Sequence, residues 1–248
     1  MSLRSVLITG ANRGIGLEFV KQLLVLPTPP KLVLATCRNP DKADELQLIA
    51  KSNSIVKVLT LDVKDVDNFP NFRQQVECEV GDNGLNLLIN NAGIMFGDSL
   101  DKVSKETMVE NFEVNVVSPL LLVKELLPLL KKAASRVNTK NLSCLRAGVV
   151  NITSKMGSID DNASGGCYPY RTSKTALNMV TKSLSVDLKP MGILVFLLHP
   201  GWVITDMGGK NALITAETSV SGMLKSILNS NEEHCGAFLN YDGKKILW

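Results

Sequence analysis

Short apolar runs and amphipathic stretches follow one another along the whole chain. The apolar runs are continuous rather than alternating with polar residues, which is typical of strands that are covered on both faces of a sheet. The runs predict seven strands. These lie at residues 6–9, 32–36, 56–61, 85–90, 148–152, 193–198 and 237–240.

The stretches between these runs carry apolar residues at helical spacing. In the segment from Tyr168 onward, for example, Ala176, Leu177, Val180 and Leu184 recur every three or four positions. The pattern predicts six helices. They lie at residues 14–26, 41–51, 66–80, 107–134, the stretch that contains Tyr170, and 218–228.

Repeated strand–helix units predict an α/β protein with a parallel sheet and right-handed crossovers. No internal repeat and no linker divides the 248 residues, so we expect a single domain over residues 1–248. The irregular segments 155–167 and 202–215 flank predicted strand ends, where open α/β sheets bind ligands. We expect residues of about 201–216 to form a lid. A third irregular segment, 135–146, is polar and has no predicted role.

Composition narrows the class of protein. Hydrophobic residues make up 45% of the chain, which is enough for a sizeable core. The net charge is +3 and no basic run exceeds two residues, which argues against nucleic acid or an anionic membrane as a main partner. The longest leucine-rich stretch contains Lys124, Glu125 and two prolines, so it is too short and too polar to span a bilayer.

Five scattered cysteines, with no C-x-x-C pair, are typical of free thiols in a reducing compartment. The first residues show no apolar signal segment. We therefore expect a cytoplasmic protein. His199 and His234 have no partner at metal-ligand spacing, so no metal site is predicted.

The first predicted strand ends in "TGANRGIG", with glycines at Gly10, Gly14 and Gly16. Glycines permit a tight turn and a close approach of backbone to ligand, and the following helix presents free N–H groups to a pyrophosphate. The loop therefore predicts a dinucleotide site. The alternative is an ordinary turn between a strand and a helix.

The end of the second predicted strand favours NADPH over NADH. NAD sites place an acidic residue there to hold the ribose 2′-hydroxyl. This chain has Arg38 there and no acid before Asp41, and Arg13 in the glycine loop adds a second cation. Two guanidinium groups suit a 2′-phosphate. The alternative is that both are ordinary surface arginines.

Tyr170 and Lys174 are four residues apart in a predicted helix, so both side chains can point into the same space. Tyr168 has no charged residue at that offset. Tyr241 also has a lysine at that offset, Lys245, but an Asp-Gly turn signal separates the two. The Tyr170 pair is therefore the candidate for chemistry.

Several motifs occur in order over nearly the whole chain: "TGANRGIG", "NNAG" at residues 90–93, "EVNVVSP", "NITSKMG", the Tyr170/Lys174 pair and "HPGWVITDM". Together they resemble the short-chain dehydrogenase/reductase family. "CRNP", "YRTSKTALN", "TKSLSVDLKP", "HPGWVITDMGG" and "NYDGKKILW" resemble more closely the sniffer-type carbonyl reductases, a subgroup related to C-factor-like proteins. The resemblance implies a doubly wound fold with a seven-stranded parallel sheet, helices on both faces and a nicotinamide cofactor, NADPH or NADP⁺.

The resemblance also implies a catalytic set. Tyr170 corresponds to the proton donor, Lys174 to the lysine that holds the ribose, and Ser154 to the serine that hydrogen-bonds the substrate carbonyl. Asn115 corresponds to the asparagine that anchors a water relay through the lysine. Ser154 precedes Tyr170 by sixteen residues, more than is common in the family, and Ser158, at twelve, is the alternative.

The remaining residues implied by the resemblance would bind the cofactor. Asp62 corresponds to the contact with the adenine ring, and Asn90 and Ala92 to the backbone that lines the adenosine side. The loop after the sixth predicted strand corresponds to the part that holds the nicotinamide. The full set is Gly10, Asn12, Arg13, Gly14, Ile15, Gly16, Arg38, Asp62, Val63, Asn90, Ala92, Gly93, Tyr170, Lys174, Pro200, Gly201, Val203 and Thr205.

These residue types suit the reduction of a carbonyl, in which the cofactor supplies a hydride and the protein a proton. A phenol of pKa about 10 is a slow acid at neutral pH. We expect the Lys174 ammonium, together with the positive nicotinamide of the oxidised cofactor, to lower that pKa. Ser154 would donate to the same substrate oxygen.

The sequence therefore predicts an NADPH-dependent carbonyl reductase that acts on small ketones, aldehydes or quinones. Trp202, Met207 and Leu213 could form an apolar substrate wall in the lid, although ordinary packing explains them equally well. One alternative is an NADP-dependent alcohol or steroid dehydrogenase. Another is a cofactor-binding signalling or redox-sensor protein of the C-factor type. Family relatives often form homodimers through their two long helices, and the oligomeric state stays open here.

Overall fold

The computed structural model describes residues 2–137, 139 and 141–248. Within these residues, seven strands form a single sheet in the order β3-β2-β1-β4-β5-β6-β7, and every neighbouring pair is parallel. The strands are β1 (Ser5–Ile8), β2 (Leu32–Cys37), β3 (Val56–Thr60), β4 (Leu87–Asn90), β5 (Gly148–Ile152), β6 (Leu194–His199) and β7 (Phe238–Asn240). The predicted seven-stranded parallel sheet is confirmed.

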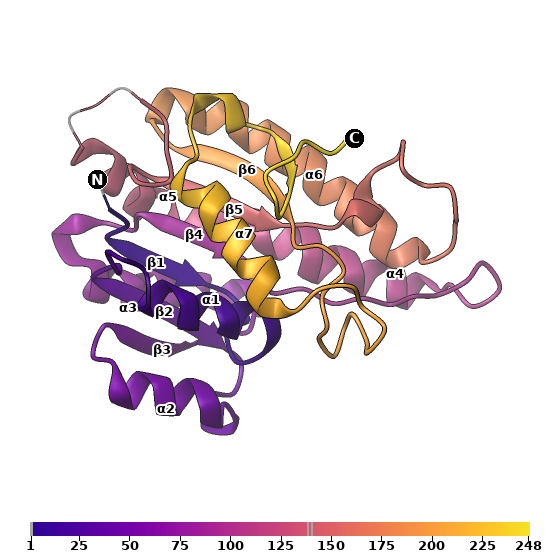
Figure 1. Ribbon diagram of the computed structural model, residues 1–248, viewed down its shortest axis with the longest axis horizontal. Helices are drawn as coiled ribbons and strands as arrows, with labels where there is room; N and C mark the ends of the chain where they lie inside the picture. Colours follow the sequence, from indigo (N-terminus) through magenta and orange to yellow (C-terminus); the bar gives the residue numbers. More distant parts are fainter. Residues whose placement is uncertain (1, 138, 140) are drawn as a thin grey trace.

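Helices cover both faces of this sheet (Figure 1). On one face, α1 (Gly14–Leu24) packs beside α7 (Ala216–Leu228), with α2 (Asp44–Ser52) near the sheet edge. The other face carries α3 (Phe69–Val80), α5 (Ser118–Ser135) and the long α6 (Tyr168–Leu188), while α4 (Lys105–Phe112) lies against α6. The molecule is therefore a three-layer α/β structure, as predicted.

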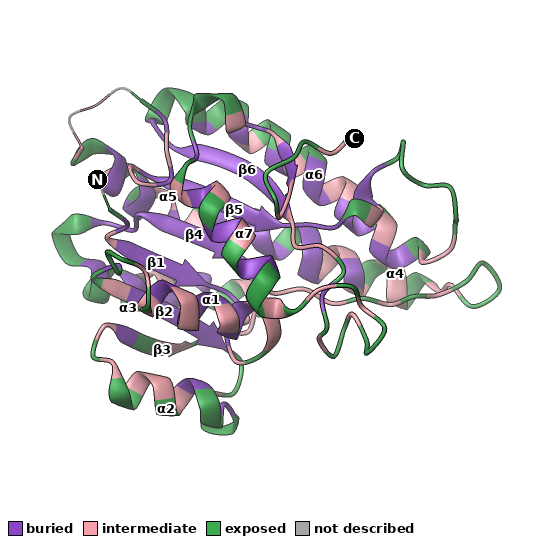
Figure 2. Ribbon diagram, in the orientation of Figure 1, coloured by how far each residue is buried: buried purple, intermediate pink, exposed green. Residues whose placement is uncertain are grey.

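The two helical layers explain why the strands read as continuous apolar runs. In β1, Val6 and Ile8 belong to the core under α1 and α7, whereas Leu7 points into the core under α3 and α5. All three side chains are fully buried. In Figure 2 most of the strands are buried, whereas the edge strand β3 is buried only at Val56. A strand with apolar neighbours on both faces therefore favours apolar side chains at most of its positions.

The predicted helix at 107–134 is continuous but not uniform. A π-helical turn, Glu113–Val117, joins α4 to α5. Such turns occur mostly as local bulges at functional sites, and this one carries Asn115. The predicted helix at 41–51 begins three residues later, because a tight turn at Pro40–Lys42 precedes it.

The helix that contains Tyr170 begins at Tyr168. Its first turn contains Pro169, and the preceding Cys167 has a left-handed backbone with φ of 48°. A left-handed residue cannot continue a helix, so Cys167 marks a sharp entry. No helix in the described part of the chain is both long enough and apolar enough to cross a membrane.

Candidate active site

A cleft of about 530 Å³ lies at the carboxyl ends of the strands. Most residues predicted to bind the cofactor line this cleft: Gly10, Asn12, Arg13, Gly14, Ile15, Arg38, Asp62, Val63, Ala92, Gly93, Tyr170, Lys174, Pro200 and Thr205. Four predicted residues do not line it, namely Gly16, Asn90, Gly201 and Val203. The position agrees with the general rule that open α/β sheets bind ligands beyond the carboxyl ends of their strands.

The glycine loop is built to admit an anion. Gly10 and Gly14 have φ of 65° and 55°, a left-handed backbone that favours glycine. A Cβ on Gly16 would lie 2.2 Å from the carbonyl oxygen of Gly10, so this position also requires glycine. At the start of α1, Arg13 makes no side-chain capping bond and the first turn contains no acid. The N–H groups there can therefore bind a pyrophosphate, and the residues present fit a dinucleotide.

Asn91, which was not predicted from the sequence, holds this loop in place. Its Nδ2 donates to the carbonyl oxygens of Thr9 and Gly10 at 2.9 and 3.1 Å. The Thr9 hydroxyl accepts from the N–H groups of Asn91 and Ala92 at 3.0 and 2.9 Å. The second asparagine of the "NNAG" motif thus ties the end of β4 to the end of β1.

Asn90 serves the interior of the protein rather than the cleft. Its Nδ2 donates to Asn151 Oδ1 at 2.8 Å, and Asn151 Nδ2 donates to Thr181 Oγ1 at 2.8 Å. All three side chains are buried. This chain of bonds connects β4, β5 and α6, and so fixes the helix that carries Tyr170.

Backbone pairing joins the two ends of the segment that is predicted to form a lid. Val203 forms an isolated bridge with Ile214, and the N–H of Ile204 donates to the Ile214 carbonyl at 2.9 Å. Gly201 has φ of 83°, and a Cβ there would lie 2.6 Å from Ile214 Cδ1. Gly201 and Val203 therefore shape the lid instead of lining the cleft.

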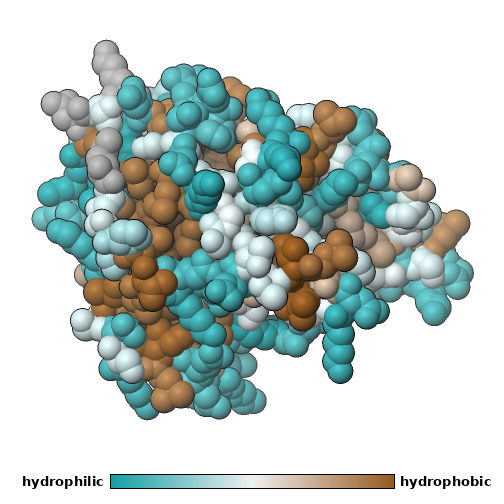
Figure 3. Space-filling model, in the orientation of Figure 1, coloured by the Kyte–Doolittle hydropathy of each residue, from teal (hydrophilic) through white to brown (hydrophobic). Residues whose placement is uncertain are grey.

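Apolar side chains project from this lid into solvent. The exposed members are Trp202, Ile204, Met207 and Leu213. Figure 3 shows a group of hydrophobic residues on the surface near this segment. Ile204 and Met207 also line the cleft, so part of this group faces the site.

Tyr170 and Lys174 lie one turn apart on α6 and are both buried. The Lys174 Nζ is 5.6 Å from the centre of the Tyr170 ring, and it donates a hydrogen bond of 3.0 Å to the carbonyl oxygen of Ile152. Because Ile152 is the last residue of β5, the ammonium group is anchored at the carboxyl end of a central strand.

Ser154 is the second residue after β5 and is 8% exposed. Its Oγ accepts from the N–H of Met156 at 3.1 Å, and its side chain lies close enough to Tyr170 to lower the pKa of that phenol, although Ser154 itself does not line the cleft. Ser158 instead lines a separate cavity of about 380 Å³ that also includes His199. The structure thus places Ser154, and not Ser158, beside the tyrosine.

Asn115 lies on the π-helical turn and does not line the cleft. Its Oδ1 accepts from the N–H of Ile94 at 3.0 Å, while its Nδ2 donates to the Ile94 carbonyl at 2.9 Å and to Ser173 Oγ at 3.0 Å. A Cβ on Gly93 would lie 3.0 Å from Asn115 Oδ1 and 3.6 Å from Lys174 Nζ. Asn115 therefore clamps the loop after β4 close to the lysine.

In the protein alone, Lys174 does not lower the phenol pKa; the lowering expected from Lys174 together with the oxidised nicotinamide stays a prediction. Burial raises the pKa of Tyr170 to about 12, and the hydrogen bond with Ser154 lowers it by less. Burial also lowers the pKa of Lys174 to about 8. Desolvation disfavours the charged form of each group, and it is the largest cause of both pKa shifts.

This burial makes a testable prediction about stability. The folded pKa of Lys174, about 8, is below its ordinary value of 10.5. Between these two values the unfolded chain retains a proton that the folded chain has lost, so the unfolding free energy of the wild type rises with pH. Lys174→Met removes this titration. From about pH 7 to pH 10, we expect the wild type to gain on the order of 2 kcal/mol relative to the variant.

Urea unfolding of both proteins at the two pH values measures this gain. Tyr170 and the other titrating groups are present in both chains and cancel in the difference. A difference between wild type and Lys174→Met that does not change with pH would contradict a lowered lysine pKa.

The two arginines take different positions in the cleft. Arg38, directly after β2, is exposed and has no ion-pair partner within the described residues. Arg13 forms an ion pair with Asp206 of the lid, and both side chains are largely exposed. Arg13 thus links the glycine loop to the lid, a contact that the sequence did not predict.

Other residues that line the cleft were also not predicted. They are Cys37, Leu61, Lys64, Asn91, Ile94, Glu110, Val114, Ile152, Thr153, Ile204 and Asp206. Most stand within four residues of a strand end, a signal that could have found them. Glu110 and Val114 come from α4 and the π-helical turn, and nothing local in the sequence marks them.

His199 ends β6, and burial lowers its pKa to about 4. The imidazole is therefore neutral near pH 7. The described residues contain no group of three or more His, Cys, Asp or Glu side chains that could hold a metal ion.

Comparison with known proteins gives a consistent result. The family model for short chain dehydrogenase matches residues 4–213. The structure is similar to the carbonyl reductase Sniffer of Drosophila melanogaster, with a TM-score of 0.98, 44% identity and complete coverage of both chains. An NADPH-bound carbonyl reductase from chicken fatty liver gives a TM-score of 0.97 at 44% identity, covering 100% of this chain and 95% of that one.

A third relative is the C-signal protein of Myxococcus xanthus. It is 42% identical over 165 residues, which make up 66% of this chain and 93% of that protein. These similarities confirm the resemblance that the motifs indicate. The sheet order, the glycine loop and the family match over residues 4–213 lead to one conclusion: the chain belongs to the short-chain dehydrogenase family.

Proposed function

We propose that the chain is an NADPH-dependent reductase of small carbonyl compounds, with Tyr170 as the proton donor. The observation that carries this proposal is the burial of Tyr170 in the cleft, with Lys174 one turn further along the same helix and Ser154 near the phenol. Two similar structures are carbonyl reductases, one of them with NADPH bound. They support the same reaction and cofactor for this chain.

When bound, the cofactor supplies the hydride that becomes attached to the carbonyl carbon. The protein supplies the proton. With a pKa of about 12 the Tyr170 hydroxyl is protonated at neutral pH, so it can donate to the substrate oxygen as negative charge develops there. The Ser154 hydroxyl donates a hydrogen bond to the same oxygen. The reaction leaves an alcohol and a Tyr170 phenolate.

Lys174 stabilises that phenolate. The pKa of its amine, about 8, keeps it mostly protonated at pH 7, and an ammonium group near a new negative charge lowers the energy of the charged form. Asn115 supports this arrangement, because it holds Ile94 and Ser173 beside the lysine. The phenolate then recovers a proton from solvent before the next turnover.

The preference for NADPH over NADH follows from the cations at one end of the cleft. Arg38 stands after β2, where NAD sites carry an acid, and Arg13 lies in the glycine loop. We expect Arg38→Asp to weaken NADPH binding by about 10–100-fold, because a charge-assisted hydrogen bond to the 2′-phosphate is lost. NADH binding should change much less. Titration of each cofactor by fluorescence measures both affinities.

Lys31→Asp is the matched control. Lys31 is exposed at the opposite end of β2, so the Lys31→Asp substitution makes the same change of charge away from the cleft. It should leave both affinities unchanged. Equal losses for NADPH and NADH in Arg38→Asp would contradict the 2′-phosphate assignment.

The apolar lid supports small apolar or aromatic ketones, aldehydes and quinones as substrates. We further propose that residues 1–248 form one domain. We also propose that the protein acts in the cytoplasm, since all five cysteines are free. Mixing the purified protein with NADPH and a panel of quinones and reactive aldehydes tests the activity directly. Loss of the absorbance of the reduced nicotinamide is the expected result, and its absence with every carbonyl would contradict the proposal.

A signalling role is the second candidate, because the C-signal protein is 42% identical over the matched 165 residues. A pure cofactor-binding protein has no need of a proton donor beside the cleft. A protein that binds NADPH but does not oxidise it with any carbonyl would favour this second function.

A further inference from the structure

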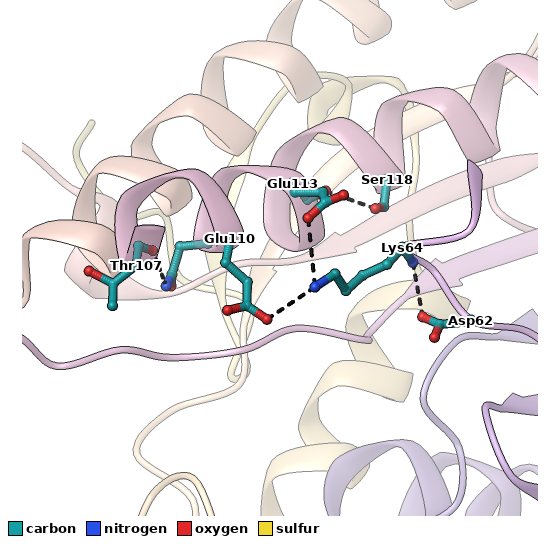
Figure 4. Close-up of polar contacts among 7 residues, drawn as sticks. Asp62, Lys64, Thr107, Glu110, Glu113 and Ser118 are labelled. Carbon is teal, nitrogen blue, oxygen red and sulfur yellow. Dashed lines mark hydrogen bonds and ion pairs between the residues drawn. The ribbon is translucent and has the colours of Figure 1, made fainter. Parts of the chain in front are cut away.

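Lys64 connects two elements that are far apart in the sequence. It stands four residues after β3, and its Nζ lies 3.2 Å from Glu110 Oε1 and 3.8 Å from Glu113 Oε2 (Figure 4). Glu110 belongs to α4, and Glu113 is the first residue of the π-helical turn. One ammonium group therefore spans the gap between the β3 loop and this helix.

The loop that Lys64 belongs to is itself ordered by a local contact. The Oδ1 of Asp62 accepts from the backbone N–H of Lys64 at 3.0 Å, which is the geometry of an Asx turn. Asp62, Val63, Lys64 and Glu110 all line the cleft. The ion pairs thus form part of the wall of the cofactor site.

The sheet order shows which end of the cleft this wall belongs to. Lys174 is bonded to the last residue of β5, whereas Asp62 and Lys64 follow β3. In the order β3-β2-β1-β4-β5, three strands separate these positions. The nicotinamide must reach the Tyr170 end to deliver its hydride. A dinucleotide that crosses the sheet ends therefore has its adenosine half beside Arg38 and Lys64.

The helix that Lys64 contacts continues into the π-helical turn that carries Asn115. Glu113 stands two residues before Asn115, which clamps Ile94 next to Lys174. The backbone carbonyl of Glu113 also accepts a bond of 2.8 Å from the Ser118 hydroxyl (Figure 4). The start of the π-helical turn is thus held at both its side chain and its backbone.

We propose that Lys64 is a positioning residue for the adenosine half of the cofactor. It fastens the loop of residues 62–64 to α4 and to the turn that carries Asn115. The side chains of Lys64, Glu110 and Glu113 are 40%, 43% and 42% exposed, and ion pairs of this exposure add little to overall stability. Their effect is local, on the shape of one wall of the cleft. This inference rests on the proposed function, because it assumes a dinucleotide in that cleft.

Binding of 2′,5′-ADP, the adenosine part of NADP⁺, tests the inference without any turnover. Isothermal titration calorimetry should show that Lys64→Met weakens 2′,5′-ADP and NADP⁺ by similar factors of about three to ten. Lys64→Arg should restore binding to within about twofold of the wild type, because a guanidinium can span the same two carboxylates. Thermal unfolding of Lys64→Met should match that of the wild type.

Lys21→Met is the matched control. Lys21 forms an ion pair of 2.6 Å with Glu45, and the two side chains are 43% and 59% exposed. Neither residue lines the cleft. Loss of this pair should not change the affinity for 2′,5′-ADP.

Loss of Lys64 could also weaken binding by electrostatic repulsion, and the same titrations separate this effect from a loss of positioning. Without Lys64, the carboxylates of Glu110 and Glu113 could repel an anionic ligand. If Lys64 acts as a fastener, the triple variant Lys64→Met, Glu110→Gln, Glu113→Gln remains as weak as Lys64→Met. Recovery of wild-type affinity in the triple variant would overturn the positioning role, as would unchanged binding in Lys64→Met.

The enzyme assay distinguishes this inference from the proposed function. In Lys64→Met the KM for NADPH should rise while kcat at saturating cofactor changes much less. A wild type that binds 2′,5′-ADP but reduces no carbonyl would contradict the proposed function alone. A wild type that binds no 2′,5′-ADP would contradict both.

Discussion

Tyr170→Phe will reduce kcat for carbonyl reduction by about 10²–10⁴-fold, the usual contribution of a positioned general acid. The substitution removes one oxygen atom from a buried side chain and leaves the ring that packs near Lys174. No other hydroxyl takes over the proton transfer, because Ser154 is a far weaker acid than a phenol. Single-turnover measurements with NADPH and a quinone report the chemical step directly.

Cofactor affinity gives the internal reference for this variant. The glycine loop, Arg38 and the lid are unchanged in Tyr170→Phe, so NADPH should bind within a few-fold of its wild-type affinity. A large loss of binding together with kcat would indicate a disturbed cleft rather than a missing proton donor.

Tyr168→Phe is the matched control, since Tyr168 lies in the first turn of the same helix and is 37% exposed. Its hydroxyl has no place in the proposed reaction, and its loss should leave kcat unchanged. If Tyr170→Phe reduced carbonyls as fast as Tyr168→Phe, the proposed reaction would be wrong.

Ser154→Ala is expected to reduce kcat by about 10²–10³-fold, the cost of one hydrogen-bond donor to a developing oxyanion. The residue follows β5 and lies close enough to Tyr170 to lower the pKa of the phenol, so the two hydroxyls can approach one substrate oxygen. The backbone N–H of Met156, which now donates to Ser154 Oγ, would lose an acceptor. A small loss of stability should therefore accompany the loss of rate.

Ser158→Ala is the control that decides between the two serines. Ser158 accepts from the N–H of Asp161 at 3.2 Å and lines the separate cavity near His199. Its replacement should leave kcat nearly unchanged, because Ser158 does not line the cleft. The opposite pattern, a fast Ser154→Ala and a slow Ser158→Ala, would move the role to Ser158.

The fold could be predicted because both faces of the sheet are covered. Continuous apolar runs then mark each strand, and all seven lie within a few residues of their predicted positions. The π-helical turn was missed for a physical reason. It adds one residue to a single helical turn, and apolar residues three or four positions apart continue on both sides of it.

The cleft could be predicted wherever a motif ends a strand. The glycine loop, Arg38 and Pro200 all belong to such ends, and the structure brings them together. The contacts of Lys64 could not be predicted, because its ion pairs join residues 46 and 49 positions apart. The raised pKa of Tyr170 was likewise missed, since it depends on how completely the folded chain excludes water from the phenol.

Because all seven strands are parallel, their carboxyl ends lie together at one end of the sheet and their amino ends at the opposite end. The cleft and lid belong to the former, whereas the start of β1 and the segment that leads into β5 belong to the latter (Figure 1). A resin, a reporter domain or an electrode linker attached before Ser5 would therefore lie on the side of the molecule opposite the cleft. A protein immobilised in that orientation would keep its cleft open to the substrate in solution.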